Sequence, residues 1–426
     1  MLDENVGFEH IVALTAIGPR VAGSPAERAA GRFLVGKFED YGLKAEIRPF
    51  PIRVWEQKAA VIDANGRSIA CTGVSFTGSG MTQARELETV YVERATEFDL
   101  KRAGVLHGKA LLIARDVYQD YPDTALFERL REFEPGAVIF TASPGHHGVP
   151  VVFYNFKDCG RVSAPPCFVV AHSDMTALVA NGPARISLQL DGSSADGQSE
   201  NVIGILEGEA ADEVVVVSAH HDTVPGSPGA TDNAGGCAVV LELARVFAAR
   251  GKPKRTIHFC SWGSHETGMH GSEAYLSSLR RSGSKVVAMI NYDCIGMTIG
   301  DDQVDILGGQ GWIEFMDAAI ARTGISPLLR HGPGFTDFTN FGAAGIPSVN
   351  IQQSYLNYNH TPDDSIDKCS PIGLIKPLAL GSVILEAVLD AEDYRPDFDA
   401  ALLDEVRMFN SRWGWSQFDE SAVLEP

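Results

Sequence analysis

Residues 213–220 read EVVVVSAH, four consecutive valines that lead through a short polar step into a histidine. A β-branched run of this length predicts a strand that is buried on both faces. Residues 201–208, 255–262 and 286–293 have the same apolar character, and residues 235–250 carry the spacing of an amphipathic helix. Buried strands that alternate with helices are typical of α/β proteins. We therefore expect a mixed, mostly parallel sheet with helices on both faces.

The length of the chain and a change of pattern within it indicate more than one domain. A chain of 426 residues exceeds what one hydrophobic core usually serves. Between residues 51 and 192, short β-branched stretches alternate with turns and show little helical spacing. We predict a catalytic domain made of residues 1–50 and 193–390, with residues 51–192 as an inserted β-rich domain. The acidic, aromatic tail at 391–426 is expected to pack on the body or on a partner subunit.

The composition narrows the classes of partner. A net charge of −20, from 35 basic and 55 acidic residues, repels nucleic acid and anionic lipid surfaces. The N-terminus is acidic where a signal peptide would be basic. We expect no apolar run that approaches the roughly 18 residues of a membrane span. Seven scattered cysteines without a CxxC pair favour a reducing compartment. We expect a cytoplasmic homo-oligomer that acts on a small molecule and binds neither nucleic acid nor membrane.

Potential metal ligands follow the predicted strands. His220 ends one strand, Asp293 ends another, and Glu266 comes shortly after a third. Ligands of open α/β sheets gather beyond the carboxyl ends of the strands, so these side chains are expected to converge. Asp232 at the mouth of a helix and His360 in a later loop complete a set of two histidines and three carboxylates. This set is typical of a site for divalent transition metals.

Each of these residues also has an ordinary structural interpretation when taken alone. Asp232 has the position of a helix N-cap, and the His220-x-Asp222 triplet is weak evidence for a metal by itself. Asp222 would then only orient the imidazole of His220 from behind. The metal hypothesis depends on all five residues lying at equivalent ends of successive strands, which packing alone rarely produces.

The motifs SAHHDT, GATDN, SHETGMHGS, INYDCIG and NHTPDD occur in the order that resembles metallopeptidase family 28, which includes leucine aminopeptidases and, by fold, glutaminyl cyclases. The resemblance implies a zinc-exopeptidase-like fold with two metal ions. One ion would be held by His220, Asp232 and Asp293, the other by Asp232, Glu266 and His360, with Asp232 as the bridge and Asp222 as support. The stretches within 51–192 resemble the protease-associated domain that this family often carries.

The sequence departs from the family at the general base. The peptidases carry Glu-Glu where this chain has His265-Glu266, and the first Glu is the base. A neutral imidazole can still accept a proton near pH 7, so His265 is a candidate base. The change removes one negative charge, which weakens cation binding and leaves open whether one or two ions bind. Manganese, zinc, cobalt and iron all suit this ligand set.

The departure leaves three functions open. In this departure the chain resembles 5-nitroanthranilate aminohydrolase. The resemblance favours metal-dependent deamination of an aromatic amine, the conversion of 5-nitroanthranilate to 5-nitrosalicylate and ammonia. The alternatives are a metal-dependent aminopeptidase with His265 as the base, and a non-catalytic binding protein on a peptidase scaffold. Candidate substrate contacts, each of which also fits a place in the core or the wall of the site, are Arg330, His331, Tyr292, Tyr355 and Tyr358.

Overall fold

The computed structural model describes residues 1–78, 81–117, 124–152, 164–282, 285–354, 357–391, 398 and 400–412. Within them, one compact unit is formed by Met1–Ile52 and Gln198–Ser411, and a second by Arg53–Gly197. The insertion expected at 51–192 differs from the second unit by two residues at one end and five at the other.

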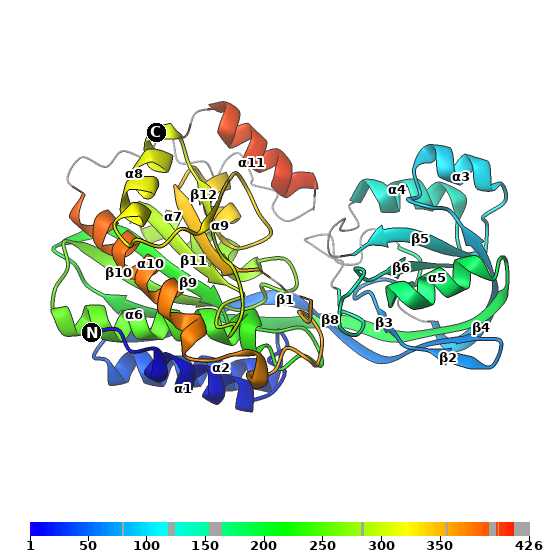
Figure 1. Cartoon of the computed structure of the whole chain (residues 1–426), viewed down its shortest axis with the longest axis horizontal. Helices are drawn as coiled ribbons and strands as arrows, with labels where there is room; N and C mark the ends of the chain where they lie inside the picture. Colours follow the sequence, from blue (N-terminus) through cyan, green and yellow to red (C-terminus); the bar gives the residue numbers. More distant parts are fainter. Residues whose placement is uncertain are drawn as a thin grey trace. The chain divides into compact units, whose positions relative to one another are not determined.

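A twisted sheet forms the centre of the first unit (Figure 1), with strand order β13-β12-β14-β11-β9-β10-β8. Its inner strands β10, β9, β11 and β14 run parallel to one another, β8 and β12 pair antiparallel to their neighbours, and β13 runs parallel to β12. This arrangement confirms the predicted mixed α/β class. The strands are β8 (Arg185–Leu206), β9 (Ala210–His220), β10 (Arg255–Trp262), β11 (Lys285–Asp293), β12 (Asp302–Leu307), β13 (Leu328–His331) and β14 (Ser348–Gln353).

Helices cover both faces of this sheet, as the valine run in β9 requires. Val215 and Val217 belong to one core cluster and Val214 and Val216 to the other, and all four are at most 1% exposed. The first cluster is closed by α1 (Glu4–Ala16), α2 (Pro25–Asp40), α6 (Gly236–Arg250), α8 (Gln310–Ala321) and α10 (Ile372–Asp390). The second is closed by α7 (His270–Ser282), α9 (Phe338–Ala343) and α11 (Ala400–Arg412).

Helix α10 corrects one expectation from the sequence. With 19 residues, α10 is the one helix among the described residues that is long and apolar enough to cross a membrane. The expectation that no apolar run approaches that length is therefore wrong. Its apolar window is 61% buried, and it packs against α1, α6 and α8. These contacts are those of a core helix, which meets the same criteria of length and composition as a membrane span.

The C-terminal helix α11 packs on the first unit. Val406 is fully buried in the cluster that α7 and α9 close, and the ring of Phe409 lies 5.3 Å from that of Phe335. Residues 392–397, 399 and 413–426 of the predicted tail lie outside the described residues.

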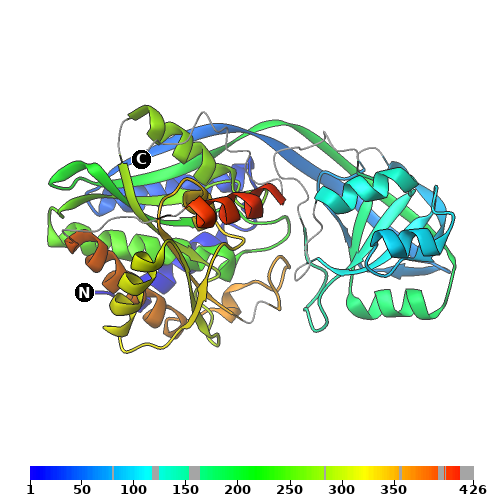
Figure 2. The same ribbon diagram turned by 90° about the horizontal axis from the view of Figure 1, so that it is seen from above.

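The second unit is rich in β-strands, with the order β8-β4-β5-β6-β7-β3. Its core contains Leu112, Ile139 and Phe168 from three adjacent strands. The unit begins and ends inside two long strands, β1 (Lys44–Ala64) and β8, which pair with each other (Figure 2). Its other elements are β2 (Arg67–Ile69), β3 (Cys71–Gly73), β4 (Met81–Tyr91), α3 (Glu97–Ala103), β5 (Ala110–Asp116), α4 (Thr124–Phe133), β6 (Ala137–Thr141), β7 (Cys167–Val170) and α5 (His172–Ala180).

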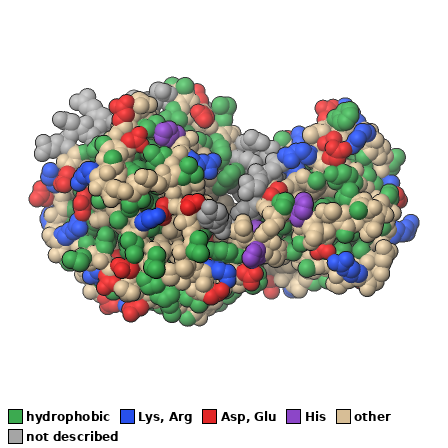
Figure 3. Space-filling view, viewed as in Figure 1, with side chains coloured by type: hydrophobic (Ala, Val, Ile, Leu, Met, Phe, Trp, Pro, Cys, Tyr) green, Lys and Arg blue, Asp and Glu red, His purple; other side chains and the backbone are tan. Residues whose placement is uncertain are grey.

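Charged side chains are dispersed on the surface. On the face drawn in Figure 3, the Lys and Arg side chains of the described residues lie among acidic and apolar ones and form no continuous patch. Some of them pair across the sequence, as Arg250 does with Glu386 at 2.6 Å. Exposed pairs of this kind contribute about 0–1 kcal/mol each, so the fold depends mainly on the buried apolar clusters of the two units.

Candidate metal centre

Five segments bring the predicted ligands to one edge of the first unit's sheet. His220 and Asp293 are the last residues of β9 and β11, and Glu266 lies in the loop after β10. Asp232 lies in the π-helical turn η1 (Ala230–Gly235) that precedes α6, and His360 lies in the loop after β14. The parallel strands β9, β10, β11 and β14 all end at this edge, which is why residues up to 140 positions apart meet there.

The donor atoms form two groups that share Asp232. In the first group, His220 Nε2 lies 3.1 Å from Asp232 Oδ1 and 3.4 Å from Asp293 Oδ1. In the second group, His360 Nε2 lies 3.4 Å from Asp232 Oδ2 and 3.1 Å from Glu266 Oε2. Ligands at about 2.1 Å from a tetrahedral ion are separated by about 3.4 Å. The spacing in both groups therefore suits a transition metal, and Asp232 uses one oxygen in each.

Two buried atoms of the first group support this assignment independently. His220 Nε2 and Asp232 Oδ1 lie 3.1 Å apart, yet neither makes a hydrogen bond of suitable geometry among the described residues, and both are shielded from solvent. An unsatisfied buried polar atom costs about 1–3 kcal/mol, so such atoms are rare unless something else binds them. A divalent cation would satisfy both atoms at once. The residues present thus fit the metal that the motifs imply.

Asp222 holds the loop that carries the predicted base. Its side chain is fully buried and accepts hydrogen bonds from the backbone N–H groups of His265, at 3.0 Å, and Glu266, at 3.1 Å. His220 Nδ1 lies 3.1 Å from the backbone oxygen of Asp222 and 3.6 Å from its carboxylate. With Nδ1 as the donor, Nε2 of His220 is left to bind a metal. Asp222 therefore supports both sides of the site without belonging to either donor group.

Asp364 holds the turn that carries the bridging carboxylate. One of its oxygens accepts from the backbone N–H and the hydroxyl of Thr231, both at 2.8 Å, and the other accepts from the backbone N–H of Asp232 at 3.0 Å. Arg20 holds the preceding residues through the backbone oxygens of Pro228, at 2.7 Å, and Gly229, at 2.9 Å. Two charged and buried side chains thus fix the turn from opposite ends.

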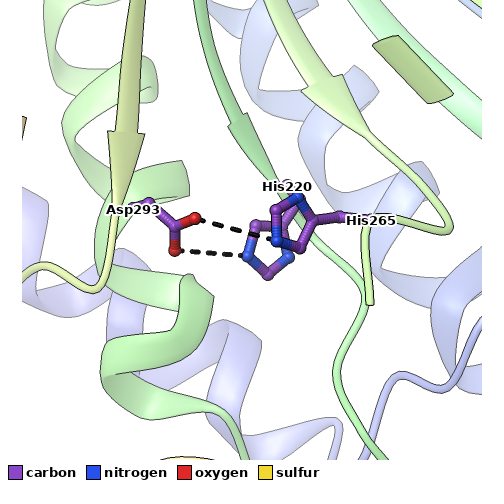
Figure 4. Close-up of side chains that lie close together, drawn as sticks. All are labelled: His220, His265 and Asp293. Carbon is purple, nitrogen blue, oxygen red and sulfur yellow. Dashed lines mark ion pairs between the residues drawn. The ribbon is translucent and has the colours of Figure 1, made fainter. Parts of the chain in front are cut away.

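His265 lies beside the first group, as Figure 4 shows. Its ring stacks on that of His220, with centroids 3.8 Å apart and planes at 7°. Its Nε2 lies 3.7 Å from Asp293 Oδ2, and its Nδ1 lies 2.8 Å from Asp337 Oδ2. The imidazole is therefore held between a buried carboxylate and the metal-binding residues.

The charges around the site shift its pKa values. Burial lowers the pKa of His265, but Asp337 and Asp293 outweigh burial and raise it to about 9. Burial also lowers the pKa of His220, and the neighbouring carboxylates raise it well above the ordinary value. The protonated imidazoles thus neutralise the carboxylates in the chain by itself. A divalent cation would supply that charge instead, so that His220 would be neutral and free to act as a ligand and His265 would be a neutral imidazole.

The predicted substrate contacts are mostly not gathered at this edge. Tyr292 alternates with Asp293 along β11, so its ring points to the opposite face, where it is fully buried and touches Gly381 of α10. Arg330 and His331 lie on β13, which β12 and β14 separate from β11. Because β12 is antiparallel to β14, β13 ends at the other edge of the sheet. These three residues are corrections to the predicted set.

The two remaining tyrosines have different outcomes. Tyr358 is half-buried two residues before His360, and burial raises its pKa. It is thus near the donor groups, with the side chain of Lys368 5.9 Å from its ring centre. Tyr355 lies outside the described residues.

Sequence reasoning missed Asp337 and Asp364. Asp364 stands in the NHTPDD motif, so a search for carboxylates next to a predicted ligand loop would have found it. Asp337 stands in FTDF, before a short helix, and nothing in that stretch indicates a partner 72 residues away.

Comparison with known proteins agrees with this geometry. Residues 201–380 match the model of Peptidase family M28. The chain is 27% identical over 400 residues to aminopeptidase YwaD of Bacillus subtilis, covering 88% of this chain and 82% of the relative. It is 24% identical over 416 residues to human carboxypeptidase Q, covering 92% of this chain and 87% of the relative.

A solved structure extends the similarity to the fold. BSAP, a zinc aminopeptidase from Bacillus subtilis, superposes with a TM-score of 0.75 at 24% identity, over 94% of this chain and 99% of that one. The matched segment contains all five predicted ligands together with His265 and Asp337. Residues 201–380 thus match Peptidase family M28, and the similarity together with the donor groups supports a metal-dependent hydrolase of the peptidase type.

Proposed function

We propose that the chain is a metal-dependent aminopeptidase. The observation that carries the proposal is the position of Asp232, which has one oxygen beside His220 and the other beside His360. Each of these histidines also lies beside a second carboxylate, Asp293 or Glu266. A carboxylate bridge of this kind supports two adjacent cations, an arrangement that aminopeptidases use. The similarity to aminopeptidase YwaD over most of both chains supports the same choice.

The donor groups assign the metal chemistry to named residues. His220, Asp232 and Asp293 would hold one ion, and Asp232, Glu266 and His360 the other. A bound metal lowers the pKa of water and polarises a carbonyl group. Asp222 and Asp364 keep the loops that carry these ligands in place, so the chain orients its ligands before any substrate arrives.

His265 supplies the proton transfer in this proposal. Its Nε2 faces the first donor group beside Asp293. It takes a proton from the attacking water and delivers it to the leaving amine, the role for which peptidases of this type use a carboxylate. A positioned acid-base group of this kind contributes roughly 100-fold to 10000-fold to the rate.

The test is hydrolysis of leucine para-nitroanilide by zinc-loaded protein, before and after metal removal by a chelator. We expect turnover that chelation abolishes and that added zinc restores. An Asp232→Asn variant should lose this activity. A Glu242→Gln variant should keep it, because Glu242 is equally buried but bonds to Asp3 and Arg245. Absence of turnover with zinc, manganese and cobalt alike would overturn the proposal.

Peptides with one blocked end define the type of exopeptidase. The human relative is named a carboxypeptidase, so both polarities need testing. An aminopeptidase cleaves Leu-Gly-amide and leaves acetyl-Leu-Gly intact. The opposite preference would keep the metal chemistry and overturn the proposed polarity.

A second candidate function is hydrolytic deamination of an aromatic amine such as 5-nitroanthranilate. The observation that favours it is His265, an imidazole in place of the carboxylate base, held by its own buried Asp337. An activated ring with a poor leaving amine needs a group that can both accept and donate a proton, which imidazole does near neutral pH. Ammonia release from 5-nitroanthranilate, without cleavage of the anilide, would make deamination the function. Cleavage of the anilide alone would exclude it.

A further inference from the structure

We infer that Asp337 is a positioning residue that acts through His265, holding the imidazole with Nδ1 protonated and Nε2 open towards the metal-binding residues. The inference rests on the proposed hydrolytic function and adds to it a residue outside the five ligands. It applies to peptide hydrolysis and to deamination alike, because both need His265 to move a proton.

Both oxygens of Asp337 have partners. Oδ2 lies 2.8 Å from His265 Nδ1, and Oδ1 accepts from the Ser272 hydroxyl at 2.5 Å. Asn340 in turn donates to the Ser272 oxygen at 2.9 Å. Asp337 is fully buried, so this network is shielded from water. The carboxylate is thereby held by Ser272 of α7, which is itself held by Asn340 of α9.

The hydrogen bond determines which nitrogen of His265 is free. A carboxylate accepts hydrogen bonds, so the group facing Asp337 Oδ2 has to be an N–H. In the neutral ring the second nitrogen then carries a lone pair. That nitrogen, Nε2, faces Asp293. Asp337 thus selects the tautomer in which the acceptor points into the site.

Donor atoms of His220, His265 and Asp293 lie within 4.8 Å of one another, but the stacking of the two imidazoles gives the rings different roles in this proposal. A metal bound by an imidazole lies close to the plane of that ring and along its nitrogen lone pair. The rings of His220 and His265 are nearly parallel, with centroids 3.8 Å apart. Two rings stacked in this way would not both direct a nitrogen lone pair at a single ion. His265 faces the space next to the ion that His220 would hold, where a reacting group would bind.

A purely structural role for Asp337 makes a different prediction from a positioning role. If Asp337 only joins α7 to α9, its loss destabilises the fold whether or not His265 is present. If it acts through His265, its loss has no further effect on catalysis once His265 is gone. A double-mutant cycle separates the two cases.

The first arm of the experiment measures kcat and KM for the substrate that is turned over, in zinc-loaded wild type, Asp337→Asn, His265→Gln and the double variant. We expect Asp337→Asn to lower kcat about 100-fold with little change in KM, as for other residues that orient a functional group. We expect the double variant to match His265→Gln. Zinc content and unfolding midpoint are measured alongside, with Glu242→Gln as the control for loss of a buried carboxylate. Additive losses in the double variant would overturn the inference while leaving the proposed function intact.

The second arm does not depend on activity. Histidine ¹⁵N–¹H spectra of the zinc-loaded protein should contain an Nδ1–H signal that disappears in His265→Gln and shifts in Asp337→Asn. Zinc has a filled d shell, so it does not broaden the signal. A wild-type His265 protonated on Nε2 alone would overturn the inference, even if Asp337→Asn fails to fold. If no substrate is turned over, the spectra still decide the position of the proton, so the two failures are distinguishable.

Discussion

The two donor groups differ in how firmly the chain holds them. His220 is fully buried at the end of a central strand, with Asp222 behind it and the ring of His265 against it. His360 belongs to a loop, its side chain is 22% exposed, and its backbone has a positive φ of 58°. A ligand on a strand keeps its geometry without a metal, whereas a ligand on a loop depends more on the ion. For the two ions that we propose, the comparison predicts tighter binding by the first group than by the second.

Removal of the firmly held ligand should have the largest effect. We expect His220→Ala to lower kcat/KM at least about 1000-fold, because a catalytic metal supplies several kcal/mol of transition-state stabilisation. Zinc content by mass spectrometry should fall in parallel. His221→Gln is the matched control: His221 is also fully buried, but its Nδ1 bonds to Ser261. Equal loss of zinc in both variants would mean that the effect is general unfolding.

Removal of the loop ligand should have a smaller effect. We expect His360→Ala to retain the first ion and lose the second, with a decrease in activity of about 10-fold to 100-fold. Zinc titration followed by calorimetry should show one binding event where the wild type shows two. A complete loss of zinc in this variant would contradict the difference between the two groups.

The turn that carries the bridge should tolerate a conservative change better than either ligand. Asp364→Asn keeps an acceptor but turns an N–H₂ towards backbone donors, which loosens Asp232. We expect the zinc affinity of both groups to fall about 10-fold. A decrease confined to the His360 group would show that Asp232 is positioned from elsewhere.

The prediction with the smallest expected effect on the metal site itself concerns Glu27, behind the first group, and the pH dependence of stability. Burial, followed by the charge of Asp222, raises the pKa of Glu27 from 4.5 to about 8. The protonated form is favoured in the fold, so its contribution is complete below pH 4.5 and is lost as the pH rises through about 8. Glu27→Gln mimics that form and keeps an acceptor near Ser199. Between pH 5 and pH 8.5, we expect the unfolding free energy of wild type to fall by roughly 3 kcal/mol more than that of Glu27→Gln. Identical urea-unfolding curves across that range would contradict the assignment.

The same difference between strand and loop residues explains which site residues could be predicted from the sequence. The ligands at the ends of β9 and β11 could be predicted because buried strands are recognised in sequence as β-branched runs. Parallel strands also end at the same edge of a sheet. The alternation of side chains also excludes Tyr292 once Asp293 is chosen as a ligand, since neighbours on a strand point to opposite faces. That step was available from the sequence and was missed.

Other features were not available from the sequence. Arg330 and His331 are residue types that suit an anionic ring, and only the antiparallel pairing of β12 with β14 shows that their strand runs to the other edge. Asp337 meets His265 because α7 and α9 pack together, a tertiary contact that no local pattern records. The structure adds these partners to a set of ligands that the strand ends had already indicated.

The most direct test of the account is anomalous diffraction from zinc-loaded crystals at the zinc absorption edge. The account predicts a strong peak among His220, Asp232 and Asp293 and a weaker one among Asp232, Glu266 and His360, with the Asp232 carboxylate between them. A single peak elsewhere, or none near Asp232 at saturating zinc, would contradict the claim that this carboxylate bridges two metal-binding groups.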